Sequence, residues 1–124
     1  MIQREVLGTP AAVGSDGSAT ATATTTCMLS GIVYSVYVDY GGSPPVGTSV
    51  VVEGANEPKQ PILTLAGNSD QWVHVLHQGQ SSADASTIVN QGALVTIRDK
   101  VTVTISSTNA DCSVSVVLIY EALK

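Results

Sequence analysis

Two histidines, His74 and His77, are spaced as H-x-x-H, a pattern that can bind a metal ion when both rings reach the same point. On a β-strand, residues three apart point to opposite faces, so these rings cannot share an ion unless the segment is irregular. The two cysteines, Cys27 and Cys112, lack the C-x-x-C spacing of zinc sites and are typical of small buried side chains. We therefore predict neither a metal site nor a cofactor.

Catalytic patterns are equally incomplete. Serine, histidine and aspartate all occur, but the G-x-S-x-G turn that presents a serine nucleophile does not. Asp39, Glu53 and Glu57 could supply the carboxylate pair of a glycosidase, but they fall at strand ends and in loops, with no spacing that pairs them. We predict no catalytic residues, and an enzyme is the least favoured class of function.

Aromatic residues are few: the chain has one tryptophan, four tyrosines and no phenylalanine. A sugar-binding surface would expose such rings, whereas a structural domain would bury them and leave the tyrosine hydroxyls at the margin. We expect Trp72, Tyr34, Tyr37 and Tyr40 to be buried or to lie in a contact between subunits. Carbohydrate binding is the alternative.

These residues must be positioned by β-strands, because no segment has a helical period. Alternation is clearest at residues 18–29, where alanines alternate with threonines, and at 32–40 and 100–106. Clusters rich in glycine and proline at 41–47 and 55–61 separate further short strands. About eight short strands predict an all-β, antiparallel β-sandwich, with a jelly roll as the first choice and an immunoglobulin-like sandwich as the second.

The alternation also predicts which side chains fill the core. In residues 32–40 the apolar face consists of the even positions, Ile32, Tyr34, Val36, Val38 and Tyr40. The side chains expected to be buried share one parity within their strands: Val36, Val38, Val101, Val103, Ile105, Val114, Val116 and Leu118. Cys27 and Cys112 fall on the presumed inner faces of the first and last strands, so we expect both to be buried and close together.

Length and charge limit the partners. A chain of 124 residues forms one domain, which we place at residues 18–124, after an N-terminal arm at residues 1–17 that shows no strand or helix period. The net charge of −5, with five basic residues, excludes direct nucleic-acid binding and disfavours anionic membranes. The apolar runs are too short to span a bilayer, and the start lacks the features of a secretory signal, so we expect synthesis in a cytosol.

The order of these elements resembles small virion proteins of tailed bacteriophages, of the head decoration or cement type. The resemblance covers roughly residues 18–121 and rests on the Thr/Ala-rich strand, on "IVYSVYVDY" and "NEPKQPILTLAGNSDQW", and on the closing "IRDKVTVTI" and "SVSVVLIYE" segments. Such proteins usually carry aromatic and proline residues after the tryptophan, whereas here Val73-His74-Val75 follows Trp72. The contacts around Trp72 are therefore not carried over from the family.

The resemblance implies a non-enzymatic capsid decoration protein, bound as a trimer or, less favoured, a dimer to the outer surface of the major capsid protein shell. It would lie on the virion surface after synthesis in the host bacterial cytoplasm. The alternative is a carbohydrate- or receptor-binding jelly-roll module of a virion fibre or tail. Candidate contacts with the capsid or a neighbouring subunit come from the arm, the two Gly/Pro-rich corners and the segment after them: Ile2, Val6, Leu7, Val13, Pro44, Pro45, Pro58, Trp72 and His74.

Overall fold

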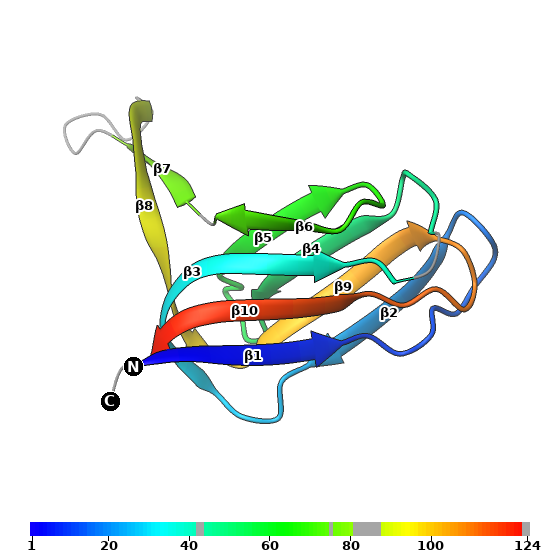
Figure 1. Ribbon diagram of the computed structural model, residues 1–124, viewed down its shortest axis with the longest axis horizontal. Helices are drawn as coiled ribbons and strands as arrows, with labels where there is room; N and C mark the ends of the chain where they lie inside the picture. The colour runs from blue at the N-terminus through cyan, green and yellow to red at the C-terminus, as the bar shows by residue number, and fades with distance from the viewer. Residues whose placement is uncertain (42–43, 75, 81–87, 123–124) are drawn as a thin grey trace.

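The protein is an all-β sandwich in the computed structural model, which describes residues 1–41, 44–74, 76–80 and 88–122. Within these residues there is no helix, and ten strands form antiparallel sheets that pack together in two layers (Figure 1). The strands are β1 (Ile2–Gly8), β2 (Ala19–Thr24), β3 (Leu29–Asp39), β4 (Ser49–Gly54), β5 (Pro61–Ala66), β6 (Gln71–His74), β7 (Leu76–Gln80), β8 (Ile88–Asp99), β9 (Val101–Thr108) and β10 (Ser115–Ala122). The predicted fold class, an antiparallel β-sandwich, is confirmed.

Strand pairing is nested from the ends of the chain inward. β1 pairs with β10, β2 with β9, β3 with β6 and β4 with β5, all antiparallel. Further pairs join β10 to β3 and β9 to β4, which gives the orders β1-β10-β3-β6 and β2-β9-β4-β5. Two such sheets of four strands are the jelly-roll arrangement. β7 and β8 form an additional hairpin between β6 and β9, and the C-terminal part of β8 continues the first sheet beside β3.

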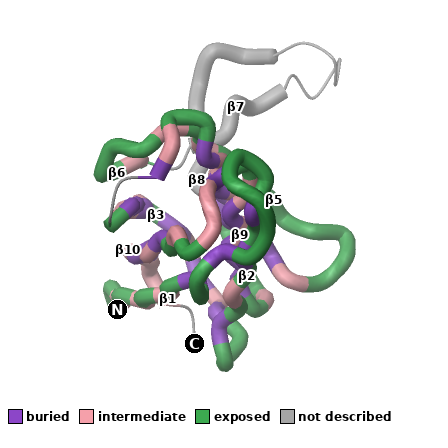
Figure 2. Tube along the Cα trace, turned by 90° about the vertical axis from the view of Figure 1, so that its right-hand side faces the viewer, coloured by how far each residue is buried: buried purple, intermediate pink, exposed green. Residues whose placement is uncertain are grey.

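The core lies between the two layers and consists mainly of aliphatic side chains. Along β9, valine and isoleucine alternate with threonine and serine, and along β4 burial alternates, with Val50 and Val52 facing the opposite sheet. Figure 2 shows buried residues concentrated along the packed strands and exposed residues along the loops. The eight side chains predicted from strand parity to be buried are buried, and Val103, Val116 and Leu118 are fully inaccessible to solvent.

The apolar face predicted for residues 32–40 is wrong in its first half, because β3 contains an irregularity opposite β10. Ser35 lies opposite Ile119, but the next pair of opposite residues is Val33 and Tyr120. Tyr34 is the extra residue of this bulge, so the alternation slips by one position. Val33 is therefore fully buried and Tyr34 is exposed. In the second half of the strand the even positions are buried as predicted.

The segment predicted as an N-terminal arm contains strand β1, so the β-structure starts at Ile2 and not at residue 18. β1 pairs along its whole length with β10, at the edge of the six-stranded sheet. After β1, the backbone N–H of Thr9 donates to the carbonyl of Val114, and the Thr9 hydroxyl accepts from the N–H of Val114. Val13 then forms a bridge with Thr20 of β2. These bonds tie residues 1–17 to the sandwich.

Cys27 and Cys112 are not buried neighbours in the core, so that prediction is also wrong. β2 ends at Thr24, and Cys27 lies exposed in the connection to β3, while Cys112 is half-buried in the loop before β10. The strand ends early because the buried Thr25 hydroxyl accepts the N–H of Val101 at 3.0 Å and donates to the carbonyl of Cys27 at 2.9 Å. These bonds turn the chain before the cysteine. Both cysteines are free thiols.

Replacing Tyr40 with phenylalanine should stabilise the protein by about 1 kcal/mol, because a buried hydroxyl without a partner carries a desolvation cost. Tyr40 is 1% exposed, and its hydroxyl oxygen has no hydrogen-bond partner among the described residues. Urea unfolding of both proteins measures the change, with Tyr34→Phe as the control, since the Tyr34 side chain is exposed. A lower midpoint for Tyr40→Phe than for Tyr34→Phe would show instead that the hydroxyl is hydrogen-bonded.

Candidate functional site

The outer face of the six-stranded sheet carries a row of apolar side chains that crosses β1, β10, β3 and β6, which lie side by side in that order in Figure 1. Val6 lies opposite Val117, Val117 opposite Tyr37, and Tyr37 opposite Trp72. Residues directly opposite one another in antiparallel strands share a face of the sheet. We call Val6, Val117, Tyr37 and Trp72 the aromatic row.

The aromatic row is open to solvent at its two ends. Val6 is 56% exposed and Trp72 is 52% exposed, whereas Val117, between its neighbours, is 8% exposed. The ring centroids of Tyr37 and Trp72 are 5.0 Å apart and their planes are tilted by 47°, a favourable arrangement for two aromatic rings. Trp72 is therefore not buried within the domain, so we still expect it to contact another molecule.

The neighbouring row toward the N-terminus of β1 is basic at its ends. Arg4 of β1 lies opposite Ile119, Ile119 opposite Ser35, and Ser35 opposite His74 of β6. Arg4 and His74 are exposed, while Ile119 and Ser35 are half-buried. One row further, the carboxylate of Glu121 is neutralised by the N-terminal amine at 3.2 Å. This side of the aromatic row therefore presents a guanidinium and an imidazole.

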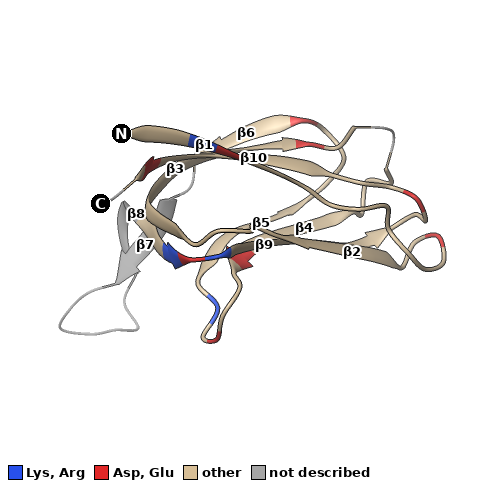
Figure 3. Cartoon of the chain, turned by 90° about the horizontal axis from the view of Figure 1, so that it is seen from below, with Lys and Arg blue, Asp and Glu red and all other residues tan. Residues whose placement is uncertain are grey.

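The opposite side of the aromatic row is acidic. Asp39 ends β3 and accepts the N–H of Gly41 at 2.8 Å, and Asp70 precedes β6 and accepts the N–H of Tyr40 at 2.7 Å. Figure 3 shows acidic residues at this end of β3 and β6; toward the other end β1 carries one basic segment, with acidic segments of β1 and β10 beside it. Partial burial raises the pKa of Tyr37, and the charges of Asp70 and Asp39 raise it further because they disfavour the phenolate. The charge on this face thus changes sign across the aromatic row.

The structure brings part of the predicted contact set onto this face. The predicted residues that are exposed on it are Ile2, Val6, Trp72 and His74. The others lie elsewhere: Leu7 points inward and packs against the core, Pro44 is buried, Pro45 is half-buried, and Val13 and Pro58 are exposed in loops. Sequence reasoning missed Val117 and Ile119. The signal for them is the unbroken apolar run of β10, which indicates a strand covered on both faces.

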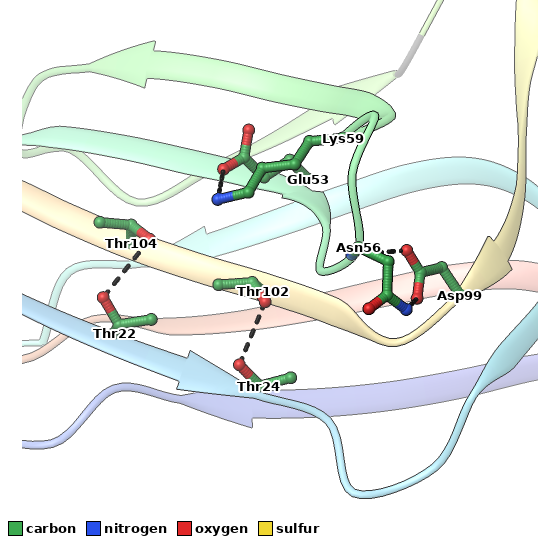
Figure 4. A network of polar contacts seen from close by, with 8 residues as sticks. All are labelled: Thr22, Thr24, Glu53, Asn56, Lys59, Asp99, Thr102 and Thr104. Carbon is green, nitrogen blue, oxygen red and sulfur yellow. Dashed lines mark hydrogen bonds and ion pairs between the residues drawn. The ribbon is translucent and has the colours of Figure 1, made fainter.

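The outer face of the four-stranded sheet is polar and largely uncharged. Threonines of β2 and β9 face one another across the strands: the hydroxyl oxygens of Thr22 and Thr104 are 3.5 Å apart, and those of Thr24 and Thr102 are 3.1 Å apart (Figure 4). Hydrogen bonds between hydroxyls across a strand pair stabilise the sheet. We call Thr22, Thr24, Thr102 and Thr104 the threonine face.

At the end of the threonine face, Asp99 joins the β4–β5 corner to the β8–β9 turn (Figure 4). Its carboxylate accepts the backbone N–H of Asn56 at 2.9 Å, the N–H of Lys100 at 2.7 Å and the side-chain amide of Asn56 at 2.6 Å. The N–H of Asn56 lowers the pKa of Asp99 most, partial burial opposes the change, and the other donors lower the pKa further. The carboxylate of Asp99 is the acceptor in each of these hydrogen bonds, so its ionised form holds the corner.

Asp99→Asn should therefore lower the unfolding midpoint at neutral pH, because one oxygen is replaced by an amide that faces another donor. A lowered pKa in the folded state means that the unfolded state binds more protons as the pH falls. The stabilisation is present above the unfolded pKa of about 4 and is lost as the pH falls through the folded value. Thermal unfolding at neutral and at acidic pH measures this. A difference in midpoint that stays constant through the acidic range would contradict the role of the charge.

The described part of the chain contains no group of three or more His, Cys, Asp and Glu residues that could hold a metal ion. His74 ends β6 and His77 belongs to β7, so the two do not share one strand; the side chain of His77 lies outside the described residues. The candidate acids are also separated, since Asp39 ends β3 in one sheet and Glu53 lies in β4 of the other. Glu53 forms an ion pair with Lys59 at 3.5 Å. In the described residues no helix is long and apolar enough to cross a membrane.

No family model matches this chain, and neither does any curated protein or solved structure. The resemblance to phage head proteins therefore rests on the sequence pattern alone. Function has to be argued from the two outer faces of the sandwich.

Proposed function

We propose that this protein is a phage capsid decoration protein, a non-enzymatic jelly roll that binds the outer surface of the major capsid protein shell and stabilises the head. The observation that carries the proposal is the pair of opposite outer faces, the aromatic row on one sheet and the threonine face on the other. A protein that joins a shell needs contact surfaces on more than one side. Jelly rolls serve this purpose in viral capsids, so the fold supports the proposal by analogy.

The composition of the two faces supports contact with protein. Charged residues are depleted from the centres of protein interfaces, and tyrosine and tryptophan are enriched there. Only 12% of this chain is charged, against about 25% in an average protein. One face contains Tyr37 and Trp72 in contact. Covering these surfaces with a partner therefore removes few charges from water.

The experiment is to purify intact particles of the phage that encodes the chain and to count its copies relative to the major capsid protein. Decoration predicts a copy number that is a simple fraction of the capsid copies, and particles that lose heat resistance when the gene is deleted. A few copies per particle would place the protein in a fibre or tail, and no copies would overturn both assignments.

A second candidate, a carbohydrate- or receptor-binding module of a fibre or tail, is favoured by the exposed Trp72, which contacts the half-buried Tyr37. An exposed aromatic ring can stack on the C–H face of a sugar, with nearby carboxylates such as Asp39 and Asp70 accepting its hydroxyls. Trp72 is the single tryptophan, so its fluorescence reports directly on this face. Titration with neutral oligosaccharides should shift its emission if the candidate is correct. An unchanged emission across a broad panel would remove it.

A further inference from the structure

We propose that two copies of this chain bind each other through the outer face of the six-stranded sheet, related by a two-fold axis that runs along the aromatic row. The inference concerns the free protein and does not depend on capsid attachment, which the threonine face and the loops remain free to make. It replaces the preference for a trimer drawn from the sequence, and it names the face, the axis and the groups that meet. The reason lies in where the charges sit around the row.

The face is complementary to itself in charge about this axis. A half-turn about the aromatic row places the end of β6 that carries His74 over the end of the partner's β6 that is preceded by Asp70, while Arg4 faces strand β1 of the partner. A half-turn about the strand direction would instead place basic side over basic side and acidic side over acidic side. Opposite charges across an interface select partners and orientations, and like charges oppose them. The charges therefore select the axis along the row.

The strand on which a residue lies then decides which residue of the partner it meets. A half-turn about the row leaves β6 facing β6 and β1 facing β1. His74 lies on one side of Trp72 and Asp70 on the other, so His74 of each copy comes to Asp70 of its partner, and symmetry makes this contact twice. Trp72 faces its own counterpart, and the 52% of its surface that is exposed becomes covered.

The size of the face sets the strength of the contact. Strands lie about 4.8 Å apart and rise about 3.3 Å per residue, so four strands of about six residues present a footprint of about 20 Å by 20 Å. That is about half of the roughly 800 Å² per partner that a stable interface buries. The dimer should therefore be weak and reversible.

The test is sedimentation velocity of the full chain, from low micromolar to near-millimolar concentration, with Trp72 fluorescence measured on the same samples. The mass should rise from one chain to two, and the emission should move to shorter wavelength in parallel as the indole leaves water. Trp72→Ala should weaken the dimer by about tenfold or more, as expected for a large aromatic residue that the contact covers. Val46→Ser is the matched control, since Val46 is 73% exposed in the loop between β3 and β4, outside the four strands of this face, and its loss should change nothing.

The predicted contact between His74 and Asp70 has its own test. His74→Asp places an acid against Asp70 of the partner and should weaken the dimer by about tenfold. Asp70→Asn removes the charge but keeps an oxygen that can accept the N–H of Tyr40, so the fold is retained. In the Asp70→Asn background, His74→Asp should have an effect of only about twofold, because the two residues are coupled. Circular dichroism checks that each variant is folded.

Four results would overturn the proposal. A mass of one chain at all concentrations would exclude the contact, and a mass of three chains would exclude the two-fold axis. A dimer that is unaffected by Trp72→Ala would show that another surface associates. Equal effects of His74→Asp with and without Asp70 would show that the charges do not meet across the axis.

Discussion

Gly31→Ala should destabilise the protein by about 3 kcal/mol, the upper end of the range for forcing an extra carbon into a packed interior. Gly31 lies in β3 opposite Ala122 of β10 and opposite Ile97 of β8, so central strands flank it on both sides. A β-carbon at this position would overlap the carbonyl oxygen of Glu121 and would lie 2.9 Å from its carbonyl carbon. These are backbone atoms, and they cannot move without opening the pairing of β3 with β10.

The matched control is Gly47→Ala. Gly47 lies in the loop before β4, and a β-carbon there meets no atom within 4 Å. Its substitution should change the stability by no more than about 0.5 kcal/mol, as is usual for surface positions. Urea unfolding of both variants measures the difference. Equal midpoints for Gly31→Ala and Gly47→Ala would show that the two strands separate more easily than their pairing indicates.

The fold class could be predicted because alternation is a local property of the sequence. In residues 100–106 every second residue is valine or isoleucine, and Val101, Val103 and Ile105 are all fully buried. The jelly-roll strand order could only be proposed from the number of strands, because pairing β1 with β10 joins residues at opposite ends of the chain. Such pairings depend on the whole core and not on any local pattern.

The error in residues 32–40 has a definite cause. Ile32 and Val33 are both apolar and β-branched, so either one fits an inward position and the sequence does not decide between them. The bulge at Tyr34 gives the inward position to Val33. A register slip of one residue changes the face of every later side chain, and nothing in the local sequence marks where it occurs.

The candidate site was the least predictable part, because its residues come from four strands. Trp72 was recognised from its type, but its neighbours on the face are set by the registers of three separate strand pairs. Strand β1 was missed for a related reason. Its inward positions are Gln3, Glu5 and Leu7, and the two polar residues hide the alternation. An edge strand tolerates them since it is only half covered.

Deleting residues 1–8 should destabilise the protein and make it prone to aggregate. If these residues were only an N-terminal arm, their deletion would leave the fold intact. The deletion removes the packing of Leu7 against the core, worth about 2 kcal/mol. The hydrogen bonds of β1 to β10 contribute less than their number suggests, since each is worth about 1 kcal/mol and ordering each residue costs about 1 to 2 kcal/mol. The loss of folding free energy should therefore be close to that of Leu7→Ala.

The larger consequence of this deletion is a new sheet edge. Without β1, strand β10 would present its unpaired backbone groups to solvent, and β10 is apolar on both faces at Val116, Val117, Leu118 and Ile119. A long apolar edge of this kind pairs with other chains. Leu7→Ala keeps β1 in place, so it should lower the urea midpoint by a similar amount and yet remain soluble. Light scattering and urea unfolding separate the two effects. A truncated protein that is soluble and has the midpoint of the full chain would show that β1 is an arm after all. Aggregation of the truncated protein alone would show that covering β10 is the main role of β1.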